Sequence, residues 1–198
     1  MSEPVFVPNI DEKSVQDPIL EAVLDVWTLA GEKHYIPIAG RSMLPLIKNG
    51  DHVLVVHGCA DVRCGDVVVF RYEGKLIAHR VLQIYKDIAG HHIFITKGDN
   101  ASRCDPPLSS SEIVGRVLSI RRGGKEMSLD TPFWRMLGWL TALSTLVWTK
   151  LFSWRSKTKH KLLGSHFNYL ATLQRRGLHV FFFSVRKILF VTLCKWKS

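Results

Sequence analysis

The sequence predicts a mainly β domain, a small antiparallel sheet or barrel, with a short helix before it and basic helices after it. Between His34 and Arg121 the apolar residues alternate with the period of strands, and Gly or Asp turns separate the runs. Little helix intervenes between these runs, which favours antiparallel pairing. A chain of 198 residues can bury a proper core in one domain with an appendage.

The N-terminal region, residues 1–33, is expected to hold one packing helix. Met1 to Asp17 is polar and acidic, so it predicts neither a secretory signal peptide nor an N-terminal anchor. From Pro18 to Glu32 apolar side chains recur at helical spacing, and Gly31 can end the helix.

Residues 34–125 carry the strands of the expected catalytic domain. Six runs are rich in Val, Ile and aromatic residues: Tyr35–Ala39, His52–Val56, Asp66–Tyr72, Lys75–Tyr85, His91–Lys97 and Ile113–Arg121. Glu73-Gly74 predicts a tight hairpin. The stretch from Arg122 to Lys125 contains two glycines and is expected to close the domain as a turn or linker.

The tail, residues 126–198, has a different composition. Residues 131–198 hold 12 Lys/Arg and no acid, whereas residues 1–130 hold 15 Lys/Arg and all 17 Asp/Glu. Five of the six tryptophans also lie beyond residue 130. Interleaved cationic and aromatic residues suit an anionic membrane surface. Nucleic acid is the competing partner, but Phe181–Phe183 and Ile188–Val191 make the tail too apolar, so no nucleic acid is expected.

Two apolar segments of the tail are expected to be helices that lie at a membrane or pack on a protein surface. In Phe133–Trp154, Arg135 and Lys150 leave 14 uncharged residues between them, a helix of about 21 Å against a hydrocarbon core of ~30 Å. This segment spans only if both cations reach the interface. Leu178–Cys194 has Arg186-Lys187 at its middle and is expected to be interfacial.

The cysteines predict neither a metal site nor a cofactor. Cys59, Cys64, Cys104 and Cys194 form no zinc-type pattern, so free thiols are the simplest interpretation, with a Cys59–Cys64 disulfide as the alternative.

One serine is placed as a nucleophile would be. Ser42 lies between Gly40, which permits unusual backbone angles, and Pro45, which fixes its own φ. A serine in such a turn can equally well bond only to local backbone groups. Ser42 becomes a nucleophile only if a base takes its proton.

The strand region supplies candidate bases and acids. His79 lies within the apolar run Ile77–Val81, and the loop that follows the next strand carries Asp99 and Asp105. Either acid could orient the imidazole of His79 and complete a Ser/His/Asp arrangement. Taken singly, a histidine in a strand and an Asp-Asn turn have ordinary structural explanations.

Together these motifs resemble the type I signal peptidase superfamily. The resemblance covers residues 38 to about 121 and rests on five motifs in order: Gly40-x-Ser42-Met43-x-Pro45 with Gly50-Asp51, Gly65–Phe70, His79-Arg80-Val81, Thr96–Asn100 with Asp105, and Gly115-Arg116-Val117. Bacterial leader peptidases and SOS-repressor self-cleaving proteases have a lysine base where this chain has His79. The sequence is therefore similar to the Ser/His branch found in the endoplasmic reticulum, archaea and some spore-forming bacteria.

The resemblance implies a serine endopeptidase that removes a leader segment, with Ser42 as nucleophile and His79 as general base. It implies Asp105 as the third member, with Asp99 as the alternative, and an oxyanion-hole donor at the Ser42 amide. Gly40, Met43 and Pro45 are implied at the substrate-binding surface, where an extended substrate with small residues before the cut adds to a sheet edge.

The chain departs from the family pattern in the place of its membrane segment and in the residues around Asp105. The family has a membrane anchor before its serine, whereas the apolar material here is C-terminal. We therefore expect association with a membrane, the plasma membrane, through the C-terminal segment, and the side that the site faces stays open. Cys104 and Pro106-Pro107 flank Asp105, where the family commonly has acids and small residues.

Two other functions remain open at the level of sequence. A self-cleaving regulator like the SOS repressors needs a cleavable bond upstream of the serine, and Ala30-Gly31 lies only 12 residues before it. A non-catalytic membrane-binding or peptide-binding module could also use this fold.

Overall fold

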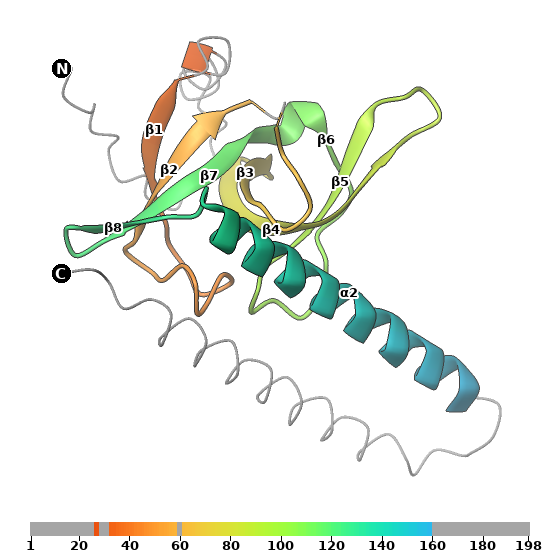
Figure 1. The fold of residues 1–198 in the computed structure, drawn as a ribbon. Coiled ribbons are helices and arrows are strands. Elements are labelled where there is room, and N and C mark those ends of the chain that lie inside the picture. The colour runs from red at the N-terminus through yellow and green to blue at the C-terminus, as the bar shows by residue number, and fades with distance from the viewer. Residues whose placement is uncertain (1–25, 28–31, 59–60, 160–198) are drawn as a thin grey trace. The chain divides into compact units, whose positions relative to one another are not determined.

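The computed structural model describes residues 26–27, 32–58 and 61–159. The chain forms two compact units, divided between Ala142 and Leu143. All eight strands and the first turns of the helix α2 (Pro132–Lys159) belong to the first unit (Figure 1). Of the predicted N-terminal helix, Val26 and Trp27 are helical, and residues 18–25 and 28–31 lie outside the described residues.

The strands of the first unit form one antiparallel sheet, so the predicted mainly β fold is confirmed. Its strands are β1 (Lys33–Pro37), β2 (His52–His57), β3 (Val67–Tyr72), β4 (Lys75–Lys86), β5 (His92–Lys97), β6 (Leu108–Ser109), β7 (Ile113–Arg122) and β8 (Lys125–Ser128). A 3-10 turn, η1 (Ser110–Glu112), leads into β7. The strand order is β1-β2-β7-β3-β4-β5-β6.

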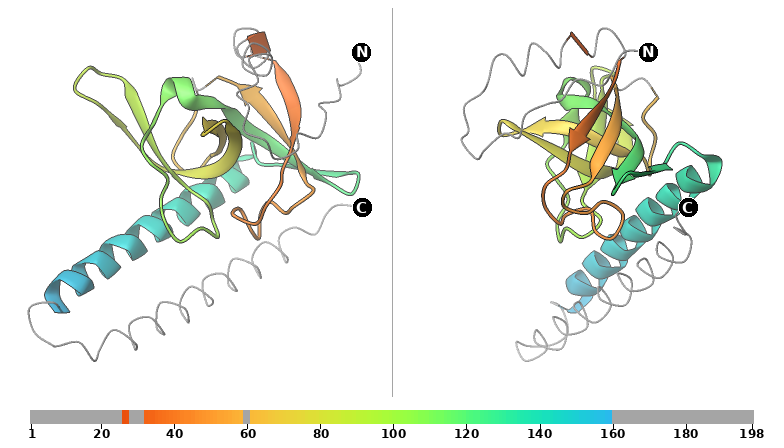
Figure 2. Two further views of the ribbon diagram at one scale, coloured as in Figure 1. Left: turned by 180° about the vertical axis from the view of Figure 1, so that it is seen from behind. Right: turned by 90° about the vertical axis from the view of Figure 1, so that its left-hand side faces the viewer.

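Strand β7 organises this sheet because it pairs along both of its edges. One edge pairs with β2; on the other, the first residues of β7 pair with β3 and the last with β8. Register shifts in the β2–β7 and β3–β7 pairs bend the ladder. Figure 2 shows the resulting strong curvature of the sheet, with β4 and β5 as a long hairpin.

The curved sheet encloses an apolar core drawn from distant parts of the sequence. Its central cluster consists of Val68, Phe70, Val81, Phe94, Leu108 and Ile113. Each fully buried large side chain contributes roughly 1.5–3 kcal/mol. The core therefore holds β3, β4 and β5 in place, and these strands carry or flank His79 and Asp105.

Two strands were missed by the sequence interpretation, and one predicted linker is a hairpin. Gly123 and Gly124 have positive φ values of 53° and 78° and turn β7 back into β8. The residues of β8, Lys-Glu-Met-Ser, show no apolar alternation. Strand β6 has two residues and follows two prolines. The predicted hairpin at Glu73-Gly74 is confirmed, with positive φ at both residues.

The first apolar segment of the tail is helical, as the sequence predicts for Phe133–Trp154. Within residues 26–27, 32–58 and 61–159, no helix has the length and apolar character needed to cross a bilayer. The second predicted segment, Leu178–Cys194, lies outside the described residues.

Candidate active site

The serine loop, residues 38–51, connects β1 to β2 and is braced at its base. Ile38 and Asp51 pair through an N–H donated by Ile38 to the Asp51 carbonyl at 2.8 Å. The carboxylate of Asp51 is buried and accepts two hydrogen bonds from the Arg122 guanidinium, at 2.7 and 2.5 Å. Two charge-assisted bonds to a buried carboxylate fix the loop to the end of β7.

Ser42 lies exposed at the tip of this loop, directly before buried side chains. Gly40 has a φ of 102°, in the region that favours glycine, and its N–H donates to Asn49 Oδ1 at 2.9 Å. Met43 is 2% exposed and anchors the chain immediately after the serine. Pro45 is half-buried and follows a cis peptide bond. The serine therefore stands in solvent on a backbone that is held from both sides.

His79 is supplied by β4, opposite Val68 of β3. It is 7% exposed, and its ring packs edge-on against Phe70 with 5.9 Å between the ring centroids. This apolar contact limits the orientations that the imidazole can take. A buried histidine needs a polar partner, because an unpaired ring nitrogen loses its hydrogen bonds to water.

Asp105 is that partner. Its Oδ2 lies 2.7 Å from His79 Nδ1 and also accepts a hydrogen bond from Thr96 Oγ1 at 2.7 Å. The backbone N–H of Asp105 donates to the Thr96 carbonyl at 2.9 Å, which fixes the loop beyond β5. A carboxylate at Nδ1 favours the tautomer with the proton on that nitrogen, and this leaves Nε2 as the proton acceptor.

The loop after β5 brings His79 and the serine loop together. Asn100 donates its backbone N–H to the Ser42 carbonyl at 2.7 Å and its side-chain amide to the Arg41 carbonyl at 3.1 Å. A Cβ on Gly98 would lie 2.7 Å from the Ser42 carbonyl oxygen and 2.9 Å from His79 Nε2. Only glycine therefore fits here, and Nε2 faces the serine loop across it.

Asp99 has a different environment from Asp105. Its carboxylate makes a two-point contact with the Arg80 guanidinium, at 2.8 Å from Nε and 2.6 Å from Nη2. Both side chains are almost fully buried, at 4% exposure for Arg80 and 3% for Asp99. The backbone N–H of Asp99 points to Met43 Sδ at 3.5 Å.

A second potential nucleophile lies beside Asp105 and is poorly suited to the role. Desolvation raises the pKa of the Cys104 thiol, so less of it is thiolate at neutral pH. Cys64 and Cys104 are free thiols. In the described part of the chain, no three His, Cys, Asp or Glu side chains are grouped closely enough to hold a metal ion.

Comparison with known sequences assigns the fold to a family. A model of the family described as Peptidase S24-like matches residues 7–118, more than half of the chain. The chain belongs to the Peptidase S24-like family. The membership predicted from the ordered motifs is therefore confirmed, and the sheet that carries Ser42, His79 and Asp105 is a peptidase-family domain.

Curated signal peptidase catalytic subunits are similar to about half of this Peptidase S24-like chain. It is 34% identical over 114 residues to the human "Putative signal peptidase complex catalytic subunit SEC11B", a match that covers 50% of this chain and 69% of that protein. It is 33% identical over 115 residues to human "Signal peptidase complex catalytic subunit SEC11C", covering 50% and 60%. The Dictyostelium discoideum subunit sec11 is 36% identical over 114 residues, covering 50% and 64%.

Some residues of this candidate site were present in the motifs but had no predicted role. Arg80 stands in the His79-Arg80-Val81 motif, and Thr96 opens the motif that contains Asp99. Their partners lie 19 and 9 residues away along the chain. A single sequence gives no signal for such pairs, because it does not say which strands are neighbours.

Proposed function

We propose that this chain is a membrane-associated serine endopeptidase of the signal peptidase type, which removes a leader segment from a protein substrate. The observation that carries the proposal is the 2.7 Å contact between His79 Nδ1 and Asp105, on a ring whose Nε2 faces the serine loop across Gly98. The similarity to SEC11 signal peptidase subunits supports the choice of substrate class.

In the proposed mechanism His79 first acts as base. Its Nε2 takes the proton of Ser42 Oγ as that oxygen attacks the scissile carbonyl, and the Ser42 N–H is one donor to the oxyanion. The imidazolium then gives its proton to the leaving amine, and an acyl-enzyme forms. A water molecule that gives its proton to His79 then attacks the acyl-enzyme. The product leaves with a new carboxyl end, and His79 returns the proton to the Ser42 oxygen.

Asp105 is the proposed third member, because it contacts His79 directly. A carboxylate there holds the imidazole in position and stabilises its charged form. Asp99 has its carboxylate committed to Arg80, so we assign it a supporting role in the loop.

The proposed substrate path runs past the exposed end of β1. Ala39, Gly40 and Arg41 are exposed beside Ser42, so an extended peptide could add to this backbone. Gly40 and the loop shape fixed by Pro45 would leave room for it. Met43 faces inward, so its proposed part is to support the substrate surface from below.

Membrane association is proposed from charge and exposure. Residues 131–198 have 12 cations and no acid. On α2, Phe133, Met136, Trp139 and Leu140 are each 44% to 53% exposed. Large apolar side chains near a basic tail suit the interface of an anionic membrane.

The proposal is tested by cleavage of a leader-bearing substrate in detergent or vesicles. Ser42→Ala and His79→Ala should each lower the rate by about 1,000-fold or more, with unchanged circular dichroism. Thr145→Ala, outside the catalytic sheet, is the control. Full activity in the His79→Ala protein would contradict the proposed base.

The same incubation separates a self-cleaving regulator from an enzyme that acts on other chains. The Ala30-Gly31 bond lies outside the described residues, so only chemistry can decide. A self-cleaving protein would release a fragment ending near Ala30 without added substrate, whereas the proposed peptidase keeps its own chain intact. A non-catalytic module would neither release this fragment nor cleave the added substrate.

A further inference from the structure

Helix α2 meets the loop before β3 through a contact that only two glycines permit. A Cβ on Gly65 would lie 2.4 Å from the Trp139 backbone nitrogen, and a Cβ on Gly138 would lie 2.6 Å from the Gly65 carbonyl oxygen. Real Cβ atoms do not approach backbone atoms so closely, so the two backbones are in direct contact. The first turns of α2 therefore have one fixed position on this edge of the first unit.

The same contact reaches Arg80. The Gly65 carbonyl accepts a hydrogen bond from Arg80 Nη1 at 2.7 Å, and a Cβ on Gly138 would stand 3.1 Å from that Nη1 atom. The backbone of α2 thus packs against a buried guanidinium. With Nε and Nη2 held by Asp99, the three nitrogens of this guanidinium are all engaged.

From Arg80 the contacts continue to the serine. Asp99 stands between Gly98 and Asn100, and the Asn100 amide holds the Ser42 carbonyl at 2.7 Å. Gly98 separates that carbonyl from His79 Nε2. A shift of Arg80 would therefore be passed through Asp99 to the distance between Ser42 and its proposed base.

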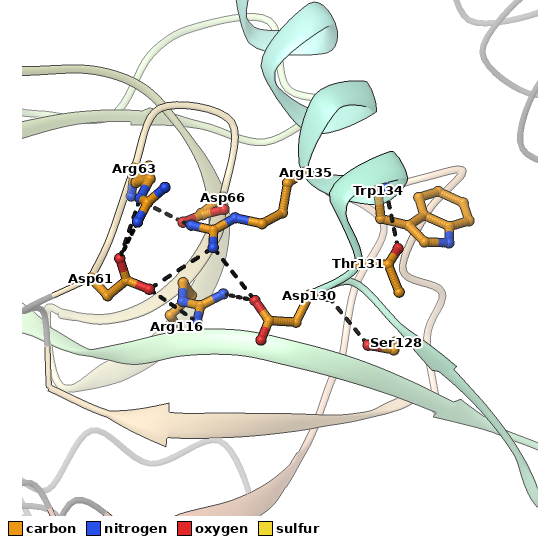
Figure 3. Close-up of polar contacts among 9 residues, drawn as sticks. All are labelled: Asp61, Arg63, Asp66, Arg116, Ser128, Asp130, Thr131, Trp134 and Arg135. Carbon is orange, nitrogen blue, oxygen red and sulfur yellow. Dashed lines mark hydrogen bonds and ion pairs between the residues drawn. The ribbon is translucent and has the colours of Figure 1, made fainter.

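Charged side chains at the start of α2 hold the helix in this contact with Gly65. Figure 3 shows Arg135 reaching back from the helix between Asp66 and Asp130, at 3.6 and 3.8 Å. Asp130 is held in turn by Arg116 of β7, with 2.6 Å between Asp130 Oδ1 and Arg116 Nη1. Asp61 lies within 4 Å of both arginines. These groups orient the helix so that Gly138 meets Gly65.

We propose that the first turns of α2, residues 132–142, are a positioning element of the catalytic site. The Gly138 backbone fixes Gly65 and Arg80, and Arg80 fixes through Asp99 the loop that holds Ser42. Gly138 and Arg80 are thus positioning residues that touch no substrate. This inference rests on the proposed peptidase function and adds to it that the helix leaving the catalytic sheet controls the geometry of the site.

The test is the Gly138→Ala variant of the full chain, assayed on a leader-bearing substrate. Alanine has a higher helix propensity than glycine, so in a helix without this contact the change would be neutral or stabilising. We expect instead that kcat falls by about 10- to 100-fold, because small displacements of catalytic groups are costly, with KM changed less than about threefold. Leu143→Ala, at an exposed position one turn further along the same helix, should keep the wild-type kcat.

A double-variant cycle with Arg80→Lys tests the path. Lysine keeps the charge but cannot make the three contacts of Arg80, so Arg80→Lys alone should lower kcat. In the Arg80→Lys protein, adding Gly138→Ala should lower kcat by less than about a further twofold, because both changes act through one group. Multiplied losses would contradict the path through Arg80. If Gly138→Ala does not fold, an unchanged kcat in Arg80→Lys overturns the proposal.

The wild-type protein separates this inference from the proposed function. A wild-type chain that neither cleaves the substrate nor reacts at Ser42 would overturn the peptidase function itself. An active wild-type chain with an equally active Gly138→Ala variant would overturn only the role of α2.

Discussion

Two aspartates close together in sequence have opposite surroundings. Asp105 is partly exposed and shares its Oδ2 between His79 and Thr96, whereas Asp99 is buried against a guanidinium. The first arrangement suits a group that must stabilise a charge formed during a reaction. The second suits a permanent ion pair that fixes a loop. The sequence did not decide which of the two acids contacts His79, because both lie in the loop that follows the next strand.

The two surroundings predict opposite phenotypes for the two asparagine variants. Asp105→Asn should lower kcat by about 100-fold or more, through loss of imidazole orientation, with a small change in stability. Asp99→Asn should lower the free energy of unfolding by about 3 kcal/mol or more, because it leaves Arg80 buried without its counter-charge. Denaturant unfolding and steady-state kinetics on both variants measure this. A fully active Asp105→Asn protein together with an inactive but fully stable Asp99→Asn protein would exchange the assignments.

At the scale of elements, β1 and β2 are joined by an unusual aromatic cluster. The rings of Trp27 and His34 stack with 3.7 Å between centroids, and His57 lies 5.3 Å from Trp27. In the described part of the chain, neither ring nitrogen of His57 has a hydrogen-bond partner. Burial, helped by the nearby His34, lowers the pKa of His57 from 6.5 to about 4.

This shift predicts a loss of stability in mild acid. The unfolded chain binds a proton at His57 below pH 6.5, whereas the folded chain binds it only near pH 4. Stability from this group is therefore complete above pH 6.5 and is lost as the pH falls toward 4, by at most about 3 kcal/mol. Denaturant unfolding at pH 7 and pH 5 should show a smaller drop for His57→Phe than for the wild type. Equal drops would assign the effect to other groups.

The strands also show what a single sequence can predict. Runs rich in Val, Ile and aromatic residues mark β2, β3, β4, β5 and β7, and in β2 and β5 the more and the less buried positions alternate along the strand. Strand β1 ends at Pro37 and was predicted two residues too late, at Tyr35–Ala39. Backbone hydrogen bonding continues at Ile38, one residue beyond the end of the strand. Strand β8 is polar, and the sequence interpretation placed Lys125 in a turn or linker and residues 126–128 in the tail. Its pairing with β7 depends on the turn at Gly123-Gly124 and on no apolar pattern of its own.

At the scale of the whole molecule, charge and catalytic chemistry are divided along the chain. The proposed catalytic residues lie in a region of slight negative charge, and the cations lie beyond residue 130. The candidate site was predictable as a set of motifs, because the family resemblance implied roles for Ser42, His79 and Asp105. The contact of α2 with Gly65 was not, because it depends on how a helix and a loop meet in space.

The charge distribution predicts selective binding to anionic vesicles. The full chain should sediment with vesicles that contain phosphatidylserine more strongly than with neutral ones, because its tail is cationic. Raising the salt to about 0.5 M should weaken this preference, since the screening length falls well below ~8 Å. Vesicle binding that remains at this salt concentration would be due to apolar side chains such as Trp139. Equal binding to neutral and anionic vesicles at low salt would contradict an electrostatic contribution.

The most direct test of the central claim is chemical labelling of the proposed nucleophile. The full-length protein is treated with a serine-directed acylating probe, and the modified residue is identified by mass spectrometry. We predict that Ser42 is labelled and that labelling is at least about 100-fold slower in the His79→Ala variant, because an exposed serine hydroxyl is a weak nucleophile without its base. An unlabelled Ser42 in the folded wild-type protein, or equal labelling in both proteins, would contradict the account.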